Sequence, residues 1–513
     1  MNRDFTQPGG VTQSRDIAQS VARNTAVQFG QQLVTWASSF VLMLFLPRIL
    51  GPERYGRIYL AEMVAAMFVV LVTYDGRFSI ARRVSRNRAA AGEILVNSIG
   101  FRLGLWVFSL VGMLMFALAA GYSTPVVIIL AIFGVEMVWN ASRTVLSGSF
   151  LGFEVTTYTA IGAIVEKMFV SAVGITALFL GGNEIVIAAV MTAGSLINFI
   201  ITAGYFRRYV PRLPRFDRAK AWILMKEGFP FLLWTIFGVV YYRIDTVMLS
   251  LMTPEKVVGW YGVAYKFYDV LVFLPSIFTI AILPVLSKLY GKENMLLART
   301  TQKGLDFILL TGIPISILCF YFSPDIIGFL FGIENYAPAV LNLRIFAAGL
   351  LLLYLDMVLA TAIIACDKQK QLAIISFVAV LLNVGMNYLM IPYTQARMDN
   401  GGVGAAIATT ITELFVLVCN LLILPKSIFE GSSLKVLWKS TAGGIATILL
   451  LGAIGRIIPG IPWMVHAAAG GIFYAGTLLL MKTFRPEEIR FFREFVNLRG
   501  LIRRIVPERS GGQ

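Results

Sequence analysis

Apolar segments long enough to cross a membrane follow one another along almost the whole chain. Each covers about 20 residues or more, which is the length that an α-helix needs to span the hydrocarbon layer. Short connections rich in Gly, Pro, Asn and charged residues separate them, as is typical of turns between helices. The pattern predicts an all-α integral membrane protein with about fourteen transmembrane helices, at 24–48, 57–76, 96–120, 125–147, 157–181, 184–206, 229–251, 258–284, 304–324, 339–365, 372–393, 402–424, 438–458 and 462–482.

The composition is that of a membrane protein. Hydrophobic residues make up 58% of the chain and charged residues 14%, whereas about a quarter of a soluble domain is charged. The mean hydropathy is +0.77. Cys319, Cys366 and Cys419 lie within or at the end of apolar segments, so we interpret them as small buried side chains and not as a disulfide or zinc framework.

The net charge of +16 is distributed unevenly between the two sets of connections. Lys and Arg are concentrated in one set, for example at 77–88 and 207–226, and at both ends of the chain. Because basic residues are enriched on the cytoplasmic side of a membrane protein, we expect both termini to be cytoplasmic. The connections on the opposite side contain Arg48, Arg54, Arg57, Lys256, Arg397 and Arg456. Nucleic-acid binding is not expected, since no segment is long enough to form a soluble basic domain.

A weak internal repeat relates the two halves of the chain. Pro52-Glu53-Arg54-Tyr55-Gly56 follows the first span, and Pro254-Glu255-Lys256-Val257-Val258-Gly259 follows the seventh. Two repeats with an even number of spans have the same orientation, and the substrate path then lies between them. We expect a cytoplasmic tail without a signal peptide at 1–22, six-helix lobes at 23–220 and 221–430, two further helices at 431–484 and a basic cytoplasmic tail at 485–513.

Charged residues within the spans are the main functional signal. A charge at the centre of the bilayer costs about 3 kcal/mol, so a large number of them predicts a hydrated cavity. The basic candidates for its lining are Arg102, Arg143, Lys167, Arg243, Lys266 and Arg344, and acidic residues at similar depth are Glu62, Glu136, Glu166, Asp245, Asp269, Asp356 and Glu413. Arg243 and Lys266 lie deepest, on the seventh and eighth spans, and are the preferred anion-binding residues.

Structural explanations for these charges stay open. Glu136 and Arg143 share one helix face and could pair with each other, as could Lys266 and Asp269. Arg102 and Arg143 lie close enough to the ends of their spans to extend toward the interface.

Two groups of polar residues add candidate sites. Tyr261, Tyr265 and Tyr268 form a stripe on the eighth span, where aromatic hydroxyl groups could contact a sugar or pack against another helix. Asp245 on the seventh span could join Asn383 and Asn387 on the eleventh. Carboxylate and amide oxygens on facing helices can bind Na⁺, transfer a proton or form interhelical hydrogen bonds.

Catalytic motifs are absent from the sequence. His466 is the only histidine, and we see neither a nucleotide-binding loop nor a metal-ligand or nucleophile motif. The sequence therefore predicts a transporter with no cofactor and no catalytic residues.

Several motifs resemble those of the polysaccharide flippases of the MOP exporter superfamily, in particular the O-antigen (Wzx-type) group. They are Leu50-Gly51-Pro52-Glu53-Arg54-Tyr55-Gly56, Arg243-Ile244-Asp245, Val258-Gly259-Trp260-Tyr261-Gly262-Val263-Ala264-Tyr265-Lys266, Pro275, Ile282-Leu283-Pro284-Val285-Leu286-Ser287 and Gly402-Val403-Gly404-Ala405-Ala406.

This resemblance implies two six-helix lobes in a V and two extra C-terminal helices, as in the MATE and MOP transporters. It implies alternating access in a cell inner membrane, with a polyprenyl-diphosphate oligosaccharide as cargo for O-antigen and lipopolysaccharide, exopolysaccharide or capsule. Other polysaccharide-assembly proteins are candidate partners.

The related lipid II flippases carry an arginine where Lys266 stands and another near Met63, which this chain lacks. In that group Asp245, Asn383, Asn387 and Thr409 would match a sodium site in which Asn387 replaces a carboxylate. Coupling to Na⁺, coupling to H⁺ and no coupling therefore stay open.

Two other functions stay open beside the flippase. A cation-coupled multidrug antiporter of the same superfamily would need an acidic pocket rather than buried Arg and Lys. A membrane glycosyltransferase or polymerase usually has a large outer loop or an acidic catalytic pair. The longest outward connection here is short, at 325–338, and contains Asp325 and Glu334.

Overall fold

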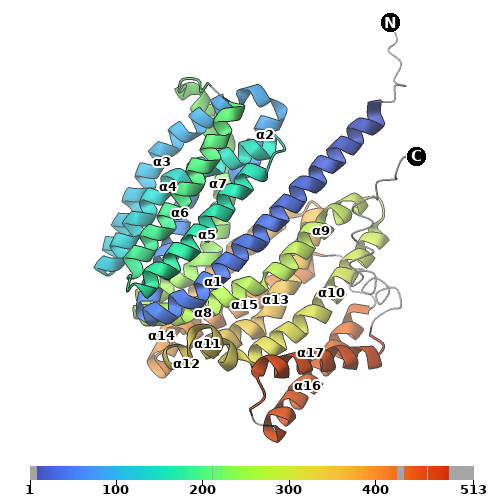
Figure 1. Ribbon diagram of the computed structural model, residues 1–513. Coiled ribbons are helices and arrows are strands. Elements are labelled where there is room, and N and C mark those ends of the chain that lie inside the picture. Colours follow the sequence, from blue (N-terminus) through green and yellow to red (C-terminus); the bar gives the residue numbers. More distant parts are fainter. Residues whose placement is uncertain (1–8, 75, 211, 425–431, 459, 484–513) are drawn as a thin grey trace, which may run out of the picture. The chain divides into compact units, whose positions relative to one another are not determined.

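The computed structural model describes residues 9–74, 76–210, 212–424, 432–458 and 460–483. Within these ranges the regular structure is entirely helical (Figure 1). The helices are α1 (Gly9–Thr73), α2 (Gly76–Arg86), α3 (Ala91–Ala119), α4 (Thr124–Gly152), α5 (Thr157–Phe179), α6 (Glu184–Tyr209), α7 (Arg218–Met252), α8 (Glu255–Leu271), α9 (Phe273–Leu289), α10 (Asn294–Tyr321), α11 (Ser323–Phe331), α12 (Ile333–Tyr336), α13 (Ala339–Ala365), α14 (Gln369–Met398), α15 (Gly401–Ile423), α16 (Ser432–Ile457) and α17 (Trp463–Leu480).

Twelve helical segments among the described residues are long and apolar enough to cross a membrane. The first of them, Ala26–Arg86, contains two of the predicted spans. The predicted span at 229–251 lies in α7, which is not among the twelve. The predicted spans therefore fall on helices of the structure, and the expectation of an all-α membrane protein is confirmed.

The first two predicted spans are joined without a loop. Inside α1 the helical geometry breaks at Gly51, which has φ 76° and ψ 169°. Positive φ is accessible to glycine at little cost, and the following Pro52 has no N–H to donate to the preceding turn. This pair turns the chain between the two spans and leaves both halves helical.

Other boundaries differ from the expected ones for local reasons. The span predicted at 258–284 is two helices, because α8 ends at Leu271 and α9 begins at Phe273, close before Pro275. The helix α7 begins at Arg218, well before the apolar segment, since Asp217 caps it by accepting hydrogen bonds from the N–H groups of Ala219 and Lys220. The length of an apolar segment predicts which part of a helix lies in the lipid. It does not predict where the helix begins or ends outside the lipid.

The chain divides into two compact units. The first comprises Met1–Phe267, Ile327–Asn342 and Ile374–Thr412, and the second comprises Tyr268–Ile326, Leu343–Ala373 and Glu413–Gln513. The lobe boundaries predicted from the sequence at 220 and 430 stay a prediction.

The first unit contains the helices α1 to α7, which pack side by side (Figure 1). Within it α5 packs on α6 and α1, and α4 packs on α2, α3 and α6. One buried apolar cluster joins α2, α3, α4 and α6 through Ile80, Leu95, Val145, Phe150 and Phe206. Burial of such side chains against other helices fixes which face of each helix is turned inward.

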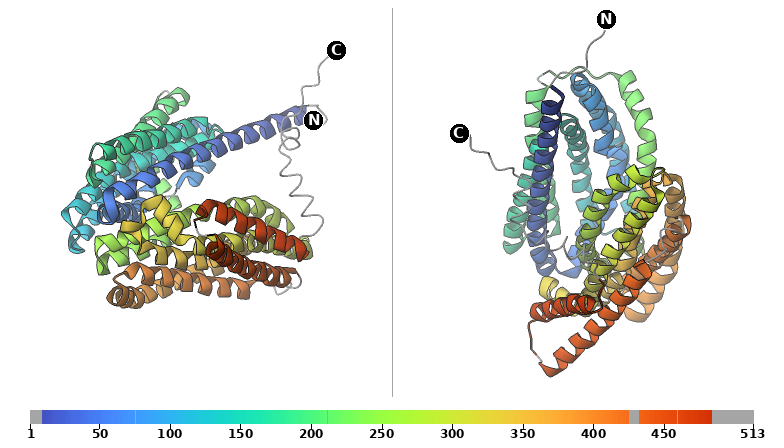
Figure 2. Two further views of the ribbon diagram at one scale, coloured as in Figure 1. Left: turned by 60° about the horizontal axis from the view of Figure 1, so that its bottom comes forward. Right: turned by 90° about the vertical axis from the view of Figure 1, so that its right-hand side faces the viewer.

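The second unit contains α10, on which α16 and α17 pack (Figure 2). Leu309 and Ile313 of α10 contact Val436 of α16, and Tyr474 and Leu478 of α17, in one apolar cluster. The two last helices are thus attached to α10 and to each other within this unit.

Candidate functional site

Two cationic side chains of the first unit reach consecutive residues of α1. Lys266 of α8 donates a hydrogen bond from Nζ to Oε2 of Glu62, at 2.9 Å. Arg243 of α7 places Nη1 3.1 Å from the sulfur of Met63. Lys266 is paired with Glu62, whereas Arg243 forms no ion pair in the described part of the chain. The group therefore carries excess positive charge at membrane depth.

The Lys266–Glu62 pair is only partly shielded, since the two side chains are 36% and 22% exposed. Lys266 also lies 5.9 Å above the ring of Tyr59. On its other side Glu62 lines a cavity of about 220 Å³ between α1, α4 and α6, together with Glu136 and Asn140. Glu62 thus pairs with Lys266 and also lines a cavity that contains a second acidic residue, Glu136.

The four residues proposed for cation coupling lie together in the first unit. Asp245 accepts hydrogen bonds from Asn387 and Thr409, both at 2.6 Å, and from Tyr261 at 3.3 Å. Asn387 also donates to Asn383 at 2.9 Å. Asp245, Asn383 and Asn387 are buried. A buried carboxylate with this set of partners is fixed in place by interhelical hydrogen bonds.

The side chains around Asp245 carry oxygen atoms that could bind a small cation. Oδ1 of Asn387 is buried without a hydrogen-bond partner among the described residues. Because the two ends of an amide are interchangeable by rotation, this oxygen could turn toward Asp245. The four side chains would then offer only oxygen ligands, which hard cations such as Na⁺ prefer. No group of three or more His, Cys, Asp or Glu in the described ranges suits a transition metal.

Glu166 of α5 is the centre of a second polar group. Its carboxylate accepts hydrogen bonds from Arg143 at 2.5 Å and from Asn198 at 2.6 Å, and Lys167 lies 3.7 Å from it. Asn198 also accepts a hydrogen bond from Thr202. Beside this group lies a cavity of about 270 Å³, lined by Gln31, Arg77, Arg143, Thr144, Ser147, Thr159, Ala163, Asn198 and Thr202.

Some residues predicted for a substrate cavity are placed differently. Arg102 is only 2% exposed and donates to the carbonyl of Ala141 at 2.8 Å. It therefore does not extend toward the interface, which was one of the explanations left open. Tyr261 and Tyr265 are buried, and their rings stack at 5.6 Å. Arg344 belongs to the second unit, where its guanidinium lies over the ring of Phe320.

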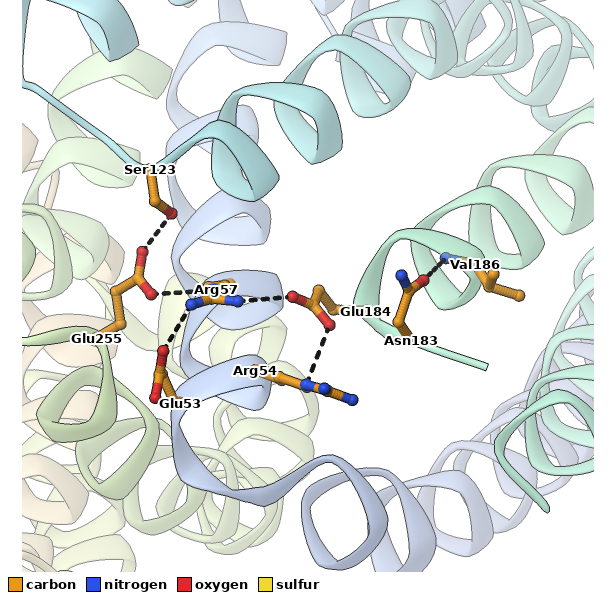
Figure 3. Close-up of polar contacts among 8 residues, drawn as sticks. All are labelled: Glu53, Arg54, Arg57, Ser123, Asn183, Glu184, Val186 and Glu255. Atoms are coloured by element: carbon orange, nitrogen blue, oxygen red, sulfur yellow. Dashed lines mark hydrogen bonds and ion pairs between the residues drawn. The ribbon is translucent and has the colours of Figure 1, made fainter. Parts of the chain in front are cut away.

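A network around Arg57 joins α1 to the first residues of α6 and α8 in the first unit (Figure 3). Its guanidinium contacts Glu53 at 2.6 Å, Glu184 at 2.9 Å and Glu255 at 2.5 Å. Glu184 begins α6, and Glu255 begins α8 and also accepts a hydrogen bond from Ser123, next to α4. Arg57 thus ties α1 to α6 and α8, and Glu255 extends the network to the residue before α4.

Beside this network α1 and α8 touch through the glycines of the internal repeat. A Cβ added to Gly56 would overlap the carbonyl oxygen of Glu255, and one added to Gly259 would overlap that of Pro52. The two repeats therefore contact each other reciprocally, each glycine facing the Pro-Glu segment of the other. This backbone approach requires residues without a side chain.

Glu184 and Asn198 were not predicted from the sequence, and Glu255 was identified only as part of the internal repeat. The repeated Pro-Glu dipeptide could have indicated the Arg57 network, because it places a carboxylate at the same point of both repeats. Asn198 lies in an otherwise apolar span and carries no such signal.

Two family models match the chain. The model of the polysaccharide biosynthesis protein family matches residues 21–290, which is more than half of the chain. The MatE model matches residues 230–389. None of the curated proteins compared with the chain matches it.

Solved transporter structures share the fold. A lipid II flippase, MurJ, in an inward closed conformation has a TM-score of 0.72 and 13% sequence identity, over 93% of this chain and 100% of that one. A multidrug resistance MATE family transporter of the MOP superfamily, in an inward-facing conformation, has a TM-score of 0.62 and 14% identity, over 76% of this chain and 94% of that one. The protein described here therefore belongs to the polysaccharide biosynthesis protein family and has the fold of the MOP superfamily transporters.

Proposed function

We propose that this protein is a flippase that moves a polyprenyl-diphosphate-linked oligosaccharide from the cytoplasmic to the outer leaflet. Its product would supply the synthesis of a cell-surface polysaccharide such as O-antigen, exopolysaccharide or capsule. The observation that carries the proposal is the approach of Arg243 and Lys266 to the adjacent residues Glu62 and Met63. Excess positive charge in a transmembrane segment is costly unless it binds an anion.

The two side chains suit a diphosphate in complementary ways. Arg243 offers a planar guanidinium for bidentate hydrogen bonds, and Lys266 offers a mobile point charge. The lipid II flippases that this chain resembles carry an arginine near the position of Met63. This chain has no arginine there. Here the guanidinium of Arg243 contacts Met63 itself. A different helix thus supplies a cation to the same place.

Alternating access requires that the outward connections separate when the sugar is released. The Arg57 network and the Gly56–Gly259 approach hold α1 and α8 together at that end. We assign these contacts to an outer gate. Its carboxylates and guanidinium can be solvated when the helices part, which lowers the cost of opening.

Asp245, with Asn383, Asn387 and Thr409, is the proposed coupling site. The carboxylate can bind a proton, or the four side chains can hold Na⁺ through their oxygens. In either case the charge of Asp245 is neutralised, and its hydrogen bonds from Asn387 and Thr409 change. Because α7, α14 and α15 meet at this residue, such a change alters the packing of three helices.

A multidrug antiporter is the second candidate, and one observation favours it. Glu62 and Glu136 line the same cavity of about 220 Å³ with Phe133 and Met137. An acidic cavity with apolar and aromatic walls suits an organic cation. In this alternative Lys266 would be a counter-ion that the drug displaces.

Flipping in proteoliposomes tests the proposal. Wild type, Arg243→Ala and Lys266→Ala would be compared with Arg456→Ala, which removes an exposed cation in α16. We expect Arg243→Ala and Lys266→Ala to lose most of the flipping of a polyprenyl-diphosphate oligosaccharide. The control, Arg456→Ala, should flip this lipid like wild type. If wild type exports an organic cation and flips no lipid, the protein is a multidrug antiporter and the flippase proposal is wrong.

A further inference from the structure

A third cavity of the first unit lies between α3 and α7 and is separate from the cationic group at Glu62. It has a volume of about 440 Å³ and is lined by Phe101, Phe216, Arg218, Ala221, Trp222 and Met225. The residues from α7 are spaced three or four apart, so they form one face of that helix. The walls are apolar and aromatic except for one guanidinium group. We call this feature the α3–α7 groove.

The floor of the groove depends on a glycine. The ring of Phe216 lies directly on Gly100 of α3, where any Cβ would overlap it. The segment before α7 is fixed as well, because the N–H of Asp217 donates to the side chain of Asn97 at 2.8 Å. Phe216 is therefore held on α3 although half of its surface is exposed.

Hydrogen bonds beside the groove tie α7 to α3 and to the residue that follows α1. Lys220 donates to Glu93 at 2.8 Å, a hydrogen bond that raises the pKa of Lys220 and keeps it charged. Tyr74, at the end of α1, donates from its hydroxyl group to the carbonyl of Met225 at 2.9 Å. The groove is thus built by contacts that do not need a ligand.

Two cations at the groove lack an acidic partner within the described residues. Arg218 lines it, and Lys226 lies 5.5 Å above the ring of Trp222, one helical turn along α7. Trp222 is 54% exposed. An exposed aromatic surface flanked by unpaired positive charge is complementary to a lipid that carries a phosphate group.

The groove lies at the expected boundary between lipid and water. Phe101 is inside the candidate span Arg88–Ala119, whereas Arg218 precedes the predicted span at 229–251. Tryptophan is enriched at this level of a membrane. The distribution of basic residues places this end of α3 and α7 on the cytoplasmic side.

We infer that the α3–α7 groove holds the lipid anchor of the substrate, a polyprenyl diphosphate, in the cytoplasmic leaflet before translocation. The isoprenoid chain lies on Phe101, Trp222 and Met225, and the diphosphate contacts Arg218 and Lys226. This inference rests on the proposed flippase function. Two cations suit a diphosphate better than the single phosphate of an ordinary phospholipid.

The position of the groove on α7 supports this role. Arg243, the proposed diphosphate ligand of the translocation path, is on the same helix, about 37 Å farther along its axis. An anchor bound at Arg218 would place the substrate beside the helix that also carries its next cationic partner. Capture and translocation would then use two separate sites on one element.

Photolabelling tests the groove directly. The probe is a polyprenyl diphosphate with a photoreactive isoprene unit, incorporated into proteoliposomes of phosphatidylethanolamine and phosphatidylglycerol that contain the full chain. We expect labels on Phe101 and on the segment 216–226, identified by mass spectrometry. Unlabelled polyprenyl diphosphate should compete, and added phosphatidylglycerol should not.

Variants separate binding from nonspecific labelling. Trp222→Ala, and Arg218→Gln combined with Lys226→Gln, should each weaken binding about tenfold, which corresponds to about 1.4 kcal/mol. Trp438→Ala is the control, since Trp438 in α16 is 72% exposed and lies beside Lys439 in sequence. All of these residues are exposed, so the variants should fold like wild type.

The possible results distinguish the two proposals. Labelling elsewhere, or equal competition by phosphatidylglycerol, would overturn the groove as the anchor site even if wild type flips the lipid. Labelling of the groove that the variants abolish would support it, and flipping measured in the same liposomes decides the proposed function separately.

Discussion

Lys266 and Glu62 form an ion pair of 2.9 Å between α8 and the second half of α1. The pair is accessible, since neither side chain is fully buried. An anionic substrate that binds Lys266 must therefore compete with a carboxylate that is already present. Such competition keeps the affinity moderate, which a transporter needs in order to release its cargo.

Removal of the Glu62 carboxylate should strengthen binding of the diphosphate. In Glu62→Gln the Lys266 ammonium loses its partner, and a partly exposed pair is worth at most about 1 kcal/mol. We expect the Kd for polyprenyl diphosphate to fall by up to roughly fivefold, with slower flipping at saturating substrate. Fluorescence titration of detergent-solubilised protein measures the Kd. Glu334→Gln, which removes an exposed carboxylate in α12, is the control. Weaker binding in Glu62→Gln would contradict the assignment of Lys266.

The reciprocal glycines should be intolerant of a methyl group. Gly56→Ala or Gly259→Ala forces apart the backbones of α1 and α8, and overpacking of this kind costs about 1–3 kcal/mol. We expect a lower Tm in detergent. Gly104→Ala is a matched control in α3, because a Cβ there meets no atom within 4 Å. Equal Tm values for all three variants would show that the two helices are not in backbone contact.

The helices themselves could be predicted from the sequence because lipid imposes a simple rule on length and polarity. The break at Gly51 was visible only as a short Gly-Pro connection, and the break between α8 and α9 was missed despite Pro275. Pro275 is the third residue of α9, in the first turn where proline is tolerated, and the apolar run continues through the break. Hydropathy therefore cannot detect it.

The partners of the buried charges could not be predicted. Arg143 shares a helix face with Glu136, yet its ion pair is with Glu166 on α5. Lys266 likewise pairs with Glu62, which is about 200 residues away in sequence. Spacing on one helix shows which residues are neighbours on that helix. The rotation of the facing helix decides which of them meet, and that rotation depends on the packing of the whole unit.

Loss of Arg57 should loosen the contacts of α6 and α8 with α1 just after the break at Gly51. Arg57→Gln leaves Glu184, which is almost fully buried, without its closest cation, and an unsatisfied buried charge costs about 1–3 kcal/mol or more. We expect faster hydrogen–deuterium exchange in the segments 119–126 and 181–187. Arg54→Gln should change little, since Arg54 is 57% exposed and lies 3.8 Å from Glu184. Unchanged exchange in Arg57→Gln would remove this network from the gate.

Neutralisation of Asp245 should separate coupling from binding. Asp245→Asn keeps the size of the side chain but only one acceptor oxygen, so it can accept the hydrogen bond from either Asn387 or Thr409 and not from both. It can neither take up a proton nor carry the charge that attracts Na⁺. We expect flipping driven by a Na⁺ or pH gradient to fall at least about tenfold, while the Kd for polyprenyl diphosphate stays within error. Asp399→Asn, at an exposed carboxylate near α15, serves as the control. If wild type and Asp245→Asn respond equally to both gradients, Asp245 is a structural residue that joins α7, α14 and α15 and not the coupling site.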